Sequence, residues 1–97
     1  MERGHVRHRR RFRVALARHT QSVTVDVGAG GFCTELIRVL PPGTPVEGSI
    51  HVDGREVPFS GRVAWARPGE FRLNLRGRMG VRFTQIPLEF TRLIAPR

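Results

Sequence analysis

Short stretches in which apolar and polar residues alternate, each ended by glycine or proline, constrain this chain more than any other feature. Val23, Val25 and Val27, for example, alternate with Thr24 and Asp26. Alternation with a period of two residues is typical of a β-strand that turns one face to a core, so the three valines are predicted to form an apolar face. The same pattern predicts strands over 12–16, 23–27, 32–36, 46–52, 56–66, 71–75 and 79–83.

The breaks between these stretches carry residues that favour tight turns. Asp53-Gly54 is the strongest hairpin signal in the chain, because aspartate and glycine tolerate the positive φ angles of a two-residue turn. Pro68-Gly69 predicts another turn. The segment 40–45 predicts a rigid loop, since proline fixes φ and lacks an N–H donor. The glycines of 28–31 indicate a turn or a bulge.

After Pro87 the pattern changes. The apolar residues of 88–94 have the spacing of a short amphipathic helix, with proline near its start. Many short strands joined by tight turns are typical of an antiparallel barrel or sandwich. The sequence therefore predicts an all-β fold of six or seven antiparallel strands, with a short C-terminal α-helix over one open end. A chain of 97 residues suits one compact core.

Charge divides the chain into two parts. Residues 1–11 contain almost nothing apolar except Val6 and are predicted to form a flexible basic N-terminal arm, while 12–97 form the barrel domain with its helix. All 17 basic residues are arginine. Residues 1–20 hold seven arginines against Glu2, a net of 7 − 1 = +6 of the total +9. Because guanidinium groups bind phosphate and the guanine edge bidentately, an anionic partner for the arm is predicted.

Other residue types give no sign of catalysis or of a metal centre. The four histidines lack metal-ligand spacing, and the acidic residues form no pair suited to acid–base catalysis. Cys33 has no histidine nearby in sequence and is predicted to be buried filler. Trp65 is predicted to pack in the core rather than to stack on a base. We therefore expect no catalytic residue, no metal and no cofactor.

Two further absences bear on location. No apolar run approaches the roughly 18 residues that span a bilayer, and the N-terminus lacks the apolar core of a signal peptide. A single cysteine excludes an intrachain disulfide and favours a reducing compartment. The expectation is a cytoplasmic protein that does not insert into a membrane.

Two clusters remain as candidate ligand sites. Residues 9–13, Arg-Arg-Arg-Phe-Arg, stand where the arm enters the first strand, and residues 26–31 combine Asp26 with a glycine-rich turn. A hairpin between 12–18 and 22–27 would bring both clusters to one end of the sheet. Arginines there can bind phosphates and the guanine edge, while a carboxylate accepts from the guanine N1 and N2 hydrogens. Glycines allow a ligand to lie close to the backbone.

With these clusters the sequence resembles the PilZ family, whose pattern is arginine-xxx-arginine followed by aspartate or asparagine-x-serine-xx-glycine. Arg9 and Arg13 match the first part and Asp26 and Gly31 the second, with Gly28 where serine is usual. The likeness extends through 40–46 and 80–83 to a terminal helix. It implies a PilZ-type β-barrel that binds cyclic di-GMP. The ligand-binding residues that it implies are Arg9, Arg10, Arg13, Asp26, Gly28 and Gly31.

The function implied by this resemblance is that of a bacterial, non-enzymatic receptor in second-messenger signalling. The stand-alone domain would order its arginine arm on cyclic di-GMP and present a changed surface to an unidentified effector protein. Gly28, together with a spacing from Arg13 to Asp26 that is shorter than usual, supports a second hypothesis, a degenerate interaction module that no longer binds nucleotide. The third, a basic barrel that binds RNA or DNA, is disfavoured because Asp26 would repel phosphates.

Overall fold

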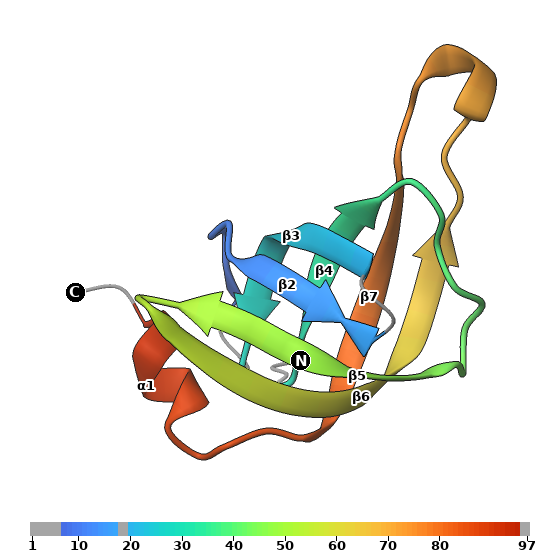
Figure 1. The fold of residues 1–97 in the computed structure, drawn as a ribbon. Helices are drawn as coiled ribbons and strands as arrows, with labels where there is room; N and C mark the ends of the chain where they lie inside the picture. Colours follow the sequence, from blue (N-terminus) through green and yellow to red (C-terminus); the bar gives the residue numbers. More distant parts are fainter. Residues whose placement is uncertain (1–6, 18–19, 96–97) are drawn as a thin grey trace.

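The structure is a computed structural model and describes residues 7–17 and 20–95. Seven strands form one sheet, which curls into a barrel and is followed by a short helix (Figure 1). The elements are β1 (Arg7–His8), β2 (Arg13–Leu16), β3 (Thr20–Gly28), β4 (Gly31–Leu36), β5 (Pro45–Val52), β6 (Arg55–Arg67), β7 (Gly77–Gln85) and α1 (Phe90–Ile94). A 3₁₀ helix, Phe71–Leu73, lies between β6 and β7.

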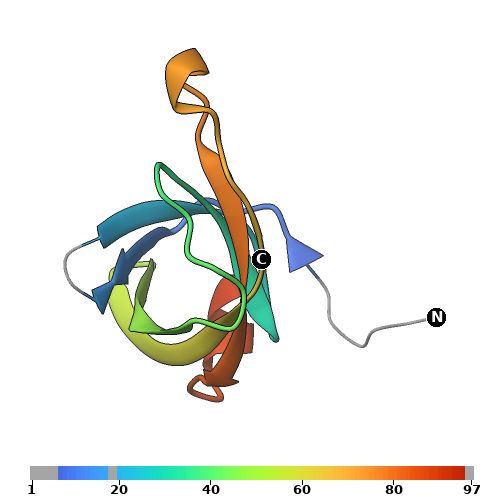
Figure 2. The ribbon, with the colours of Figure 1, turned by 90° about the vertical axis from the view of Figure 1, so that its right-hand side faces the viewer.

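Six of the strands close into an antiparallel barrel. Each of β2 to β7 pairs with two neighbours, in the cyclic order β2, β3, β4, β7, β6, β5 and back to β2. The short β1 adds to β3 beyond the end of β2, with Arg7 opposite Gly28. The predicted all-β barrel of six or seven strands is therefore confirmed, and closure excludes the open sandwich (Figures 1 and 2).

The hairpin predicted at Asp53-Gly54 joins β5 to β6. Asp53 has φ 50° and Gly54 has φ 80°, the left-handed backbone that a two-residue turn between twisted strands requires. Glycine adopts this conformation without strain, and aspartate adopts it more readily than most residues do. The register of the hairpin runs without interruption from Val52 opposite Arg55 to Pro45 opposite Arg62.

One predicted strand is wrong. The alternating segment 71–75 forms the 3₁₀ helix and a turn at Asn74, which has φ 61°. The β6–β7 hairpin extends beyond the barrel here (Figures 1 and 2), and the only ladder contact within 68–76 is an isolated bridge between Glu70 and Leu75. Alternation predicts a strand only where a neighbouring strand and a core are present, and this tip has neither.

The predicted apolar face of the second strand is also wrong in part. Ser22 and Thr24 are buried, whereas Val23 and Val25 are only half buried. A bulge between Thr24 and Asp26 then restores the expected orientation, so that Val27 is fully buried. A bulge adds one residue and reverses the alternation beyond it, which is why periodicity misassigned the first half of β3 and not the second.

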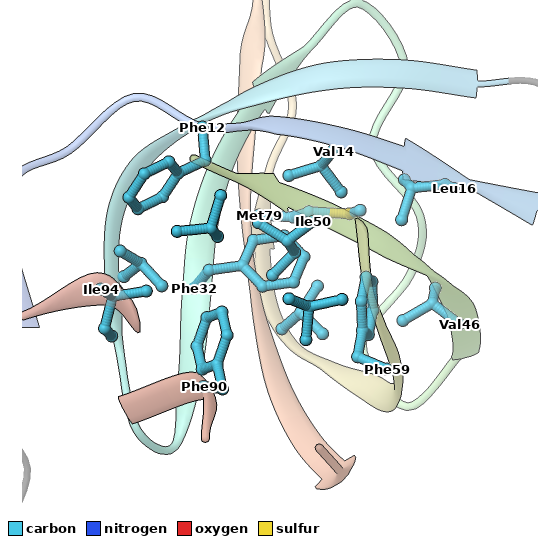
Figure 3. Close-up of a cluster of buried hydrophobic side chains, with 14 of the residues drawn as sticks. Phe12, Val14, Leu16, Phe32, Val46, Ile50, Phe59, Met79, Phe90 and Ile94 are labelled. Atoms are coloured by element: carbon cyan, nitrogen blue, oxygen red, sulfur yellow. The ribbon is translucent and has the colours of Figure 1, made fainter. Parts of the chain in front are cut away.

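The core fills the barrel from end to end. Phe32 and Phe59 meet edge to face with ring centroids 5.3 Å apart, a favourable geometry for aromatic pairs. Phe90 and Ile94 of α1 are fully buried at one end of the barrel (Figure 3), so the helix covers that opening as predicted. The helix begins at Phe90, later than the sequence pattern suggested, and Leu88 lies outside it with 99% of its surface exposed.

Buried hydroxyl groups fasten the segment before β2 to the barrel. The Thr24 hydroxyl accepts a hydrogen bond from the Phe12 amide at 2.8 Å and donates one to the Arg10 carbonyl at 2.5 Å. The hydroxyls of Thr34 and Ser22 lie 2.8 Å apart in the same region. These bonds satisfy polar atoms that would otherwise be buried without partners, and they hold residues 10–12 against β3.

Replacing Thr24 with valine is expected to lower the free energy of unfolding by about 1–3 kcal/mol, because the Phe12 amide loses its acceptor inside the protein. Urea denaturation with linear extrapolation measures the change. Thr84→Val, at an exposed position of β7, is the matched control and is expected to shift stability by less than about 0.5 kcal/mol. Equal stability of the Thr24 variant and the wild type would contradict this role.

Candidate functional site

The outer face of β3, β4, β7 and β6 gathers the predicted site residues. Residues that stand directly opposite one another on neighbouring strands point to the same side of a sheet. One such row crosses four strands and consists of Asp26, Cys33, Gly80 and Trp65. Because the residues next to this row in sequence, Val27, Phe32 and Val81, are buried in the core, the row itself faces outward.

The indole of Trp65 packs against Gly80. A Cβ atom added at Gly80 would overlap the indole nitrogen of Trp65, so only glycine at this position lets the ring rest on the sheet. Trp65 is 43% exposed, and the prediction that it packs in the core is wrong. The reason is a second bulge, between Val63 and Trp65. Val63 points inward, and strict alternation would turn Trp65 inward too, but the extra residue turns it out.

A neighbouring row on the same face contains Gly28, Gly31, Arg82 and Arg62. Both arginines are exposed. Gly31 is required by packing, because a Cβ atom there would overlap the carbonyl oxygen of Val81. Gly28 is buried at the end of β3, between Arg7 of β1 and Gly31 of β4. Both predicted site glycines are buried, and they lie in the row next to that of Asp26.

The third row begins at Arg13, which stands opposite Val23 and is exposed. It continues through Glu35 to Arg78, whose Nε donates to the Glu35 carboxylate at 3.1 Å. A depression of about 200 Å³ lies beside this row and is lined by Arg11 and Arg13, among others. The ion pair neutralises Glu35, so Arg13 faces no uncompensated carboxylate in this row.

The leader segment before β2 runs alongside Asp26. His8 stands opposite Val27 and the Phe12 carbonyl accepts from the Thr24 amide, so residues 9–11 cross the edge of β3 between them. Arg9 is exposed. Arg10 is committed elsewhere in this structure: its guanidinium donates to the Ile94 carbonyl at 2.9 Å and lies 4.8 Å from the centre of the Phe12 ring. The first six residues of the predicted arm lie outside the described part of the chain.

These positions bring most of the predicted residues onto one surface. Asp26, Gly28 and Gly31 are adjacent on it, and Arg13 stands on the same face one row away. The depression at Arg13 does not include Asp26, and its volume is below the 300–1,000 Å³ typical of ligand pockets. The surface is therefore an open platform, and Arg9 stands at its edge as a group that can close over a ligand.

Sequence reasoning missed Trp65, Arg62 and Arg82. The sequence did contain a signal for Arg82. Arg78, Gly80 and Arg82 alternate with the apolar residues of the final strand, and this alternation predicts that the three residues face outward. The pairing of Trp65 with Gly80 depends on the register of β6 against β7, which no local pattern gives. Together with Asp26 and the glycines, these residues make a basic surface with one carboxylate and one exposed aromatic ring.

Two classes of site receive no support from the described residues. Within 7–17 and 20–95, no three histidine, cysteine, aspartate or glutamate side chains come together as a metal site would require. In that same part of the chain, no helix has both the length and the apolar character needed to cross a membrane.

Comparison with known proteins supports this description. The model of the PilZ domain family matches residues 2–95. The structure resembles that of the Bacillus subtilis inhibitor of motility MotI/DgrA with a TM-score of 0.80 at 14% sequence identity, over 95% of this chain and 47% of that one. The chain thus spans about half the length of that protein, and at this identity the likeness shows the fold alone. A search of curated proteins gave no match.

Proposed function

Because the chain belongs to the PilZ domain family, we propose that it is a cyclic di-GMP receptor that closes its arginine leader over the nucleotide and signals to a partner protein. PilZ domains are receptor or adaptor domains of the cyclic di-GMP-binding type rather than enzymes. The observation that carries the proposal is the platform on which Asp26 and Trp65 stand in one row, separated by Cys33 and Gly80. We also propose that the protein is bacterial and that it acts in the cytoplasm.

The chemistry of the ligand matches the residues of the platform. The Asp26 carboxylate can accept from the N1 and N2 hydrogens of one guanine, a pairing that adenine does not offer. Trp65 offers an indole face on which a base can stack. Arg82 supplies a guanidinium group for the phosphates. Arg62 can do so only by giving up its bond to the Gly43 carbonyl, to which its guanidinium donates at 3.0 Å. Gly28 and Gly31 carry no side chain that would project between the sheet and the ligand.

The leader supplies the remaining cations. Arg13 is held on β2 and faces the platform, while Arg9 is exposed on the segment that crosses the edge of β3. A nucleotide on the platform would lie within the field of these guanidinium groups, and each bidentate pair with phosphate is a charge-assisted bond. Closure of Arg9 over the ligand changes the surface near β1, and that change is the proposed signal.

Calorimetric titration with cyclic di-GMP tests the proposal. Wild-type protein is expected to bind, and Arg9→Ala or Arg13→Ala is expected to weaken binding about tenfold, equivalent to about 1.4 kcal/mol, through loss of a charge-assisted hydrogen bond. Arg55→Ala is the control, because Arg55 is exposed and lies at the other end of β6 from Trp65. Absence of binding by wild type, or equal affinities for all four proteins, would defeat the receptor proposal.

Gly28 favours one competing function, that of an interaction module without a nucleotide ligand. The family usually has serine at this position, so one hydroxyl contact is missing. In a weakened receptor, Gly28→Ser is expected to improve affinity by about 2- to 12-fold, the equivalent of one hydrogen bond worth 0.5–1.5 kcal/mol. In a degenerate module the same change creates no measurable affinity. Calorimetry at matched protein concentration separates the two outcomes.

A further inference from the structure

A second surface lies at the end of the molecule away from α1. The β6–β7 hairpin projects beyond the barrel there (Figures 1 and 2), and it exposes two leucines. Leu73 is 67% exposed and Leu75 is 58% exposed, and Ile37, just after β4, is 72% exposed. We call these three residues, together with Arg38, Arg72 and Arg76, the tip surface. Neither the core nor the proposed nucleotide platform uses its apolar side chains.

The tip surface is hollow rather than flat. Ile37 and Leu75 line a depression of about 390 Å³ between the hairpin and the segment after β4. A larger depression of about 700 Å³ adjoins it at the open end of the barrel and includes Leu36 and Leu40. Ile37, Arg38 and Arg76 line both. The two depressions share these three residues, and together they form what we call the groove, between the barrel opening and the hairpin.

Charge around the groove is mostly positive. Within 37–38 and 67–76 the sequence holds four arginines (Arg38, Arg67, Arg72 and Arg76) against Glu70. Glu47 also lines the larger depression, so the net charge of these residues is 4 − 2 = +2. Guanidinium groups beside exposed leucines would repel a basic segment and attract an acidic one. Apolar anchors within a polar rim are the usual composition of a protein-binding groove.

We propose that the tip surface binds an acidic segment of a partner protein, which places two apolar side chains in the groove and carboxylates against Arg38, Arg72 and Arg76. A concave groove with side-chain walls accepts individual residues, whereas a lipid surface is flat, and this favours a protein segment over a membrane. The inference names the partner side of the proposed signalling, but it does not depend on nucleotide binding. Of the tip surface, only Arg76 also lines the depression beside Arg13, and the two leucines and Ile37 do not.

Selection from a random peptide library displayed on phage tests the inference, with the full chain as bait. Enriched peptides are expected to carry aspartate or glutamate around two apolar residues. A synthetic copy of the most enriched peptide is then titrated by NMR, with the largest shifts expected at Ile37, Arg38 and Leu75. No enrichment, enrichment of neutral or basic peptides, or shifts confined to other residues would overturn the proposal.

Variants distinguish this surface from the rest of the protein. The double variant Leu73→Ser/Leu75→Ser is expected to lower the affinity for the peptide by about tenfold or more, because the peptide loses its apolar contacts with the two leucines. Leu88→Ser is the matched control, since Leu88 is 99% exposed near α1, and it is expected to leave affinity unchanged. Both proteins are checked for folding by circular dichroism. Equal loss in the control, or none in the double variant, would overturn the proposal.

Two more measurements separate the alternatives. The Arg13→Ala protein is expected to bind the peptide as wild type does and cyclic di-GMP about tenfold more weakly. The Leu73/Leu75 double variant is expected to bind the nucleotide as wild type does and the peptide more weakly, so failure of one proposal is distinguishable from failure of the other. Sedimentation with vesicles of phosphatidylglycerol and phosphatidylcholine addresses the lipid alternative. Wild-type binding to those vesicles that the double serine variant loses would assign the tip surface to membranes and overturn the proposal.

Discussion

Asp26→Ala is expected to weaken binding of cyclic di-GMP by about 10- to 150-fold, because hydrogen bonds to a charged group contribute about 1.5–3 kcal/mol. The carboxylate stands on the outer face of β3 beside Gly28, where it can accept both hydrogens from a guanine edge. Asp26→Asn keeps one acceptor oxygen and is expected to lose less. Titration calorimetry measures all three proteins.

Base selectivity gives this prediction its sharpest form. Adenine lacks the N1 and N2 hydrogens that guanine presents, so wild-type protein is expected to prefer cyclic di-GMP to cyclic di-AMP, and Asp26→Ala is expected to reduce that preference. Glu47→Ala, an exposed carboxylate on β5, controls for net charge. An Asp26→Ala protein that keeps its affinity and its full base preference would remove the carboxylate from the proposed site.

Trp65→Ala is expected to lower the affinity for cyclic di-GMP by about 5- to 150-fold, since stacking on an aromatic side chain contributes about 1–3 kcal/mol per base. Trp65 is the single tryptophan of the chain and packs against Gly80, so its fluorescence reports on the platform alone. Saturating nucleotide is expected to quench it. Trp65→Phe retains a ring and is expected to retain most of the affinity.

The fluorescence and the calorimetry check each other. Because Trp65 is 43% exposed, its replacement by alanine is expected to leave the fold intact, which thermal denaturation verifies. Nucleotide binding that is detected by heat while the tryptophan emission stays unchanged would put the ligand somewhere other than over Gly80. An alanine variant with wild-type affinity would lead to the same conclusion.

Sequence alone predicted the architecture because the barrel rests on local signals. Alternation marks strands wherever one face is buried, and the Asp53-Gly54 turn fixes the register of β5 against β6. The prediction failed at 71–75, where alternation continues into a hairpin that leaves the barrel and has no core to face. A periodic pattern cannot show whether a neighbouring strand is present.

The site was predictable only in part, and the two bulges explain the division. Asp26 faces outward, but the bulge beside it placed Thr24 in the core where the pattern had placed Val23 and Val25. The bulge at Val63 turned Trp65 out onto Gly80. Each bulge depends on how two strands fit together, and no single strand carries that information. The arginine leader was identifiable because clustered charge needs no register.

The hydrogen bond from Arg10 to the Ile94 carbonyl makes binding of a phosphate by Arg10 compete with the packing of α1. The Arg10 guanidinium donates to a carbonyl in the last turn of α1. If it bound a phosphate instead, that carbonyl would lose its donor. A nucleotide that bound to Arg10 would therefore loosen the helix, and its affinity would be lower by the free energy of that loosening. Binding linkage is reciprocal: a partner that binds more tightly when α1 is packed against the barrel would lower the affinity for that nucleotide, and the nucleotide would lower the affinity for the partner by the same factor.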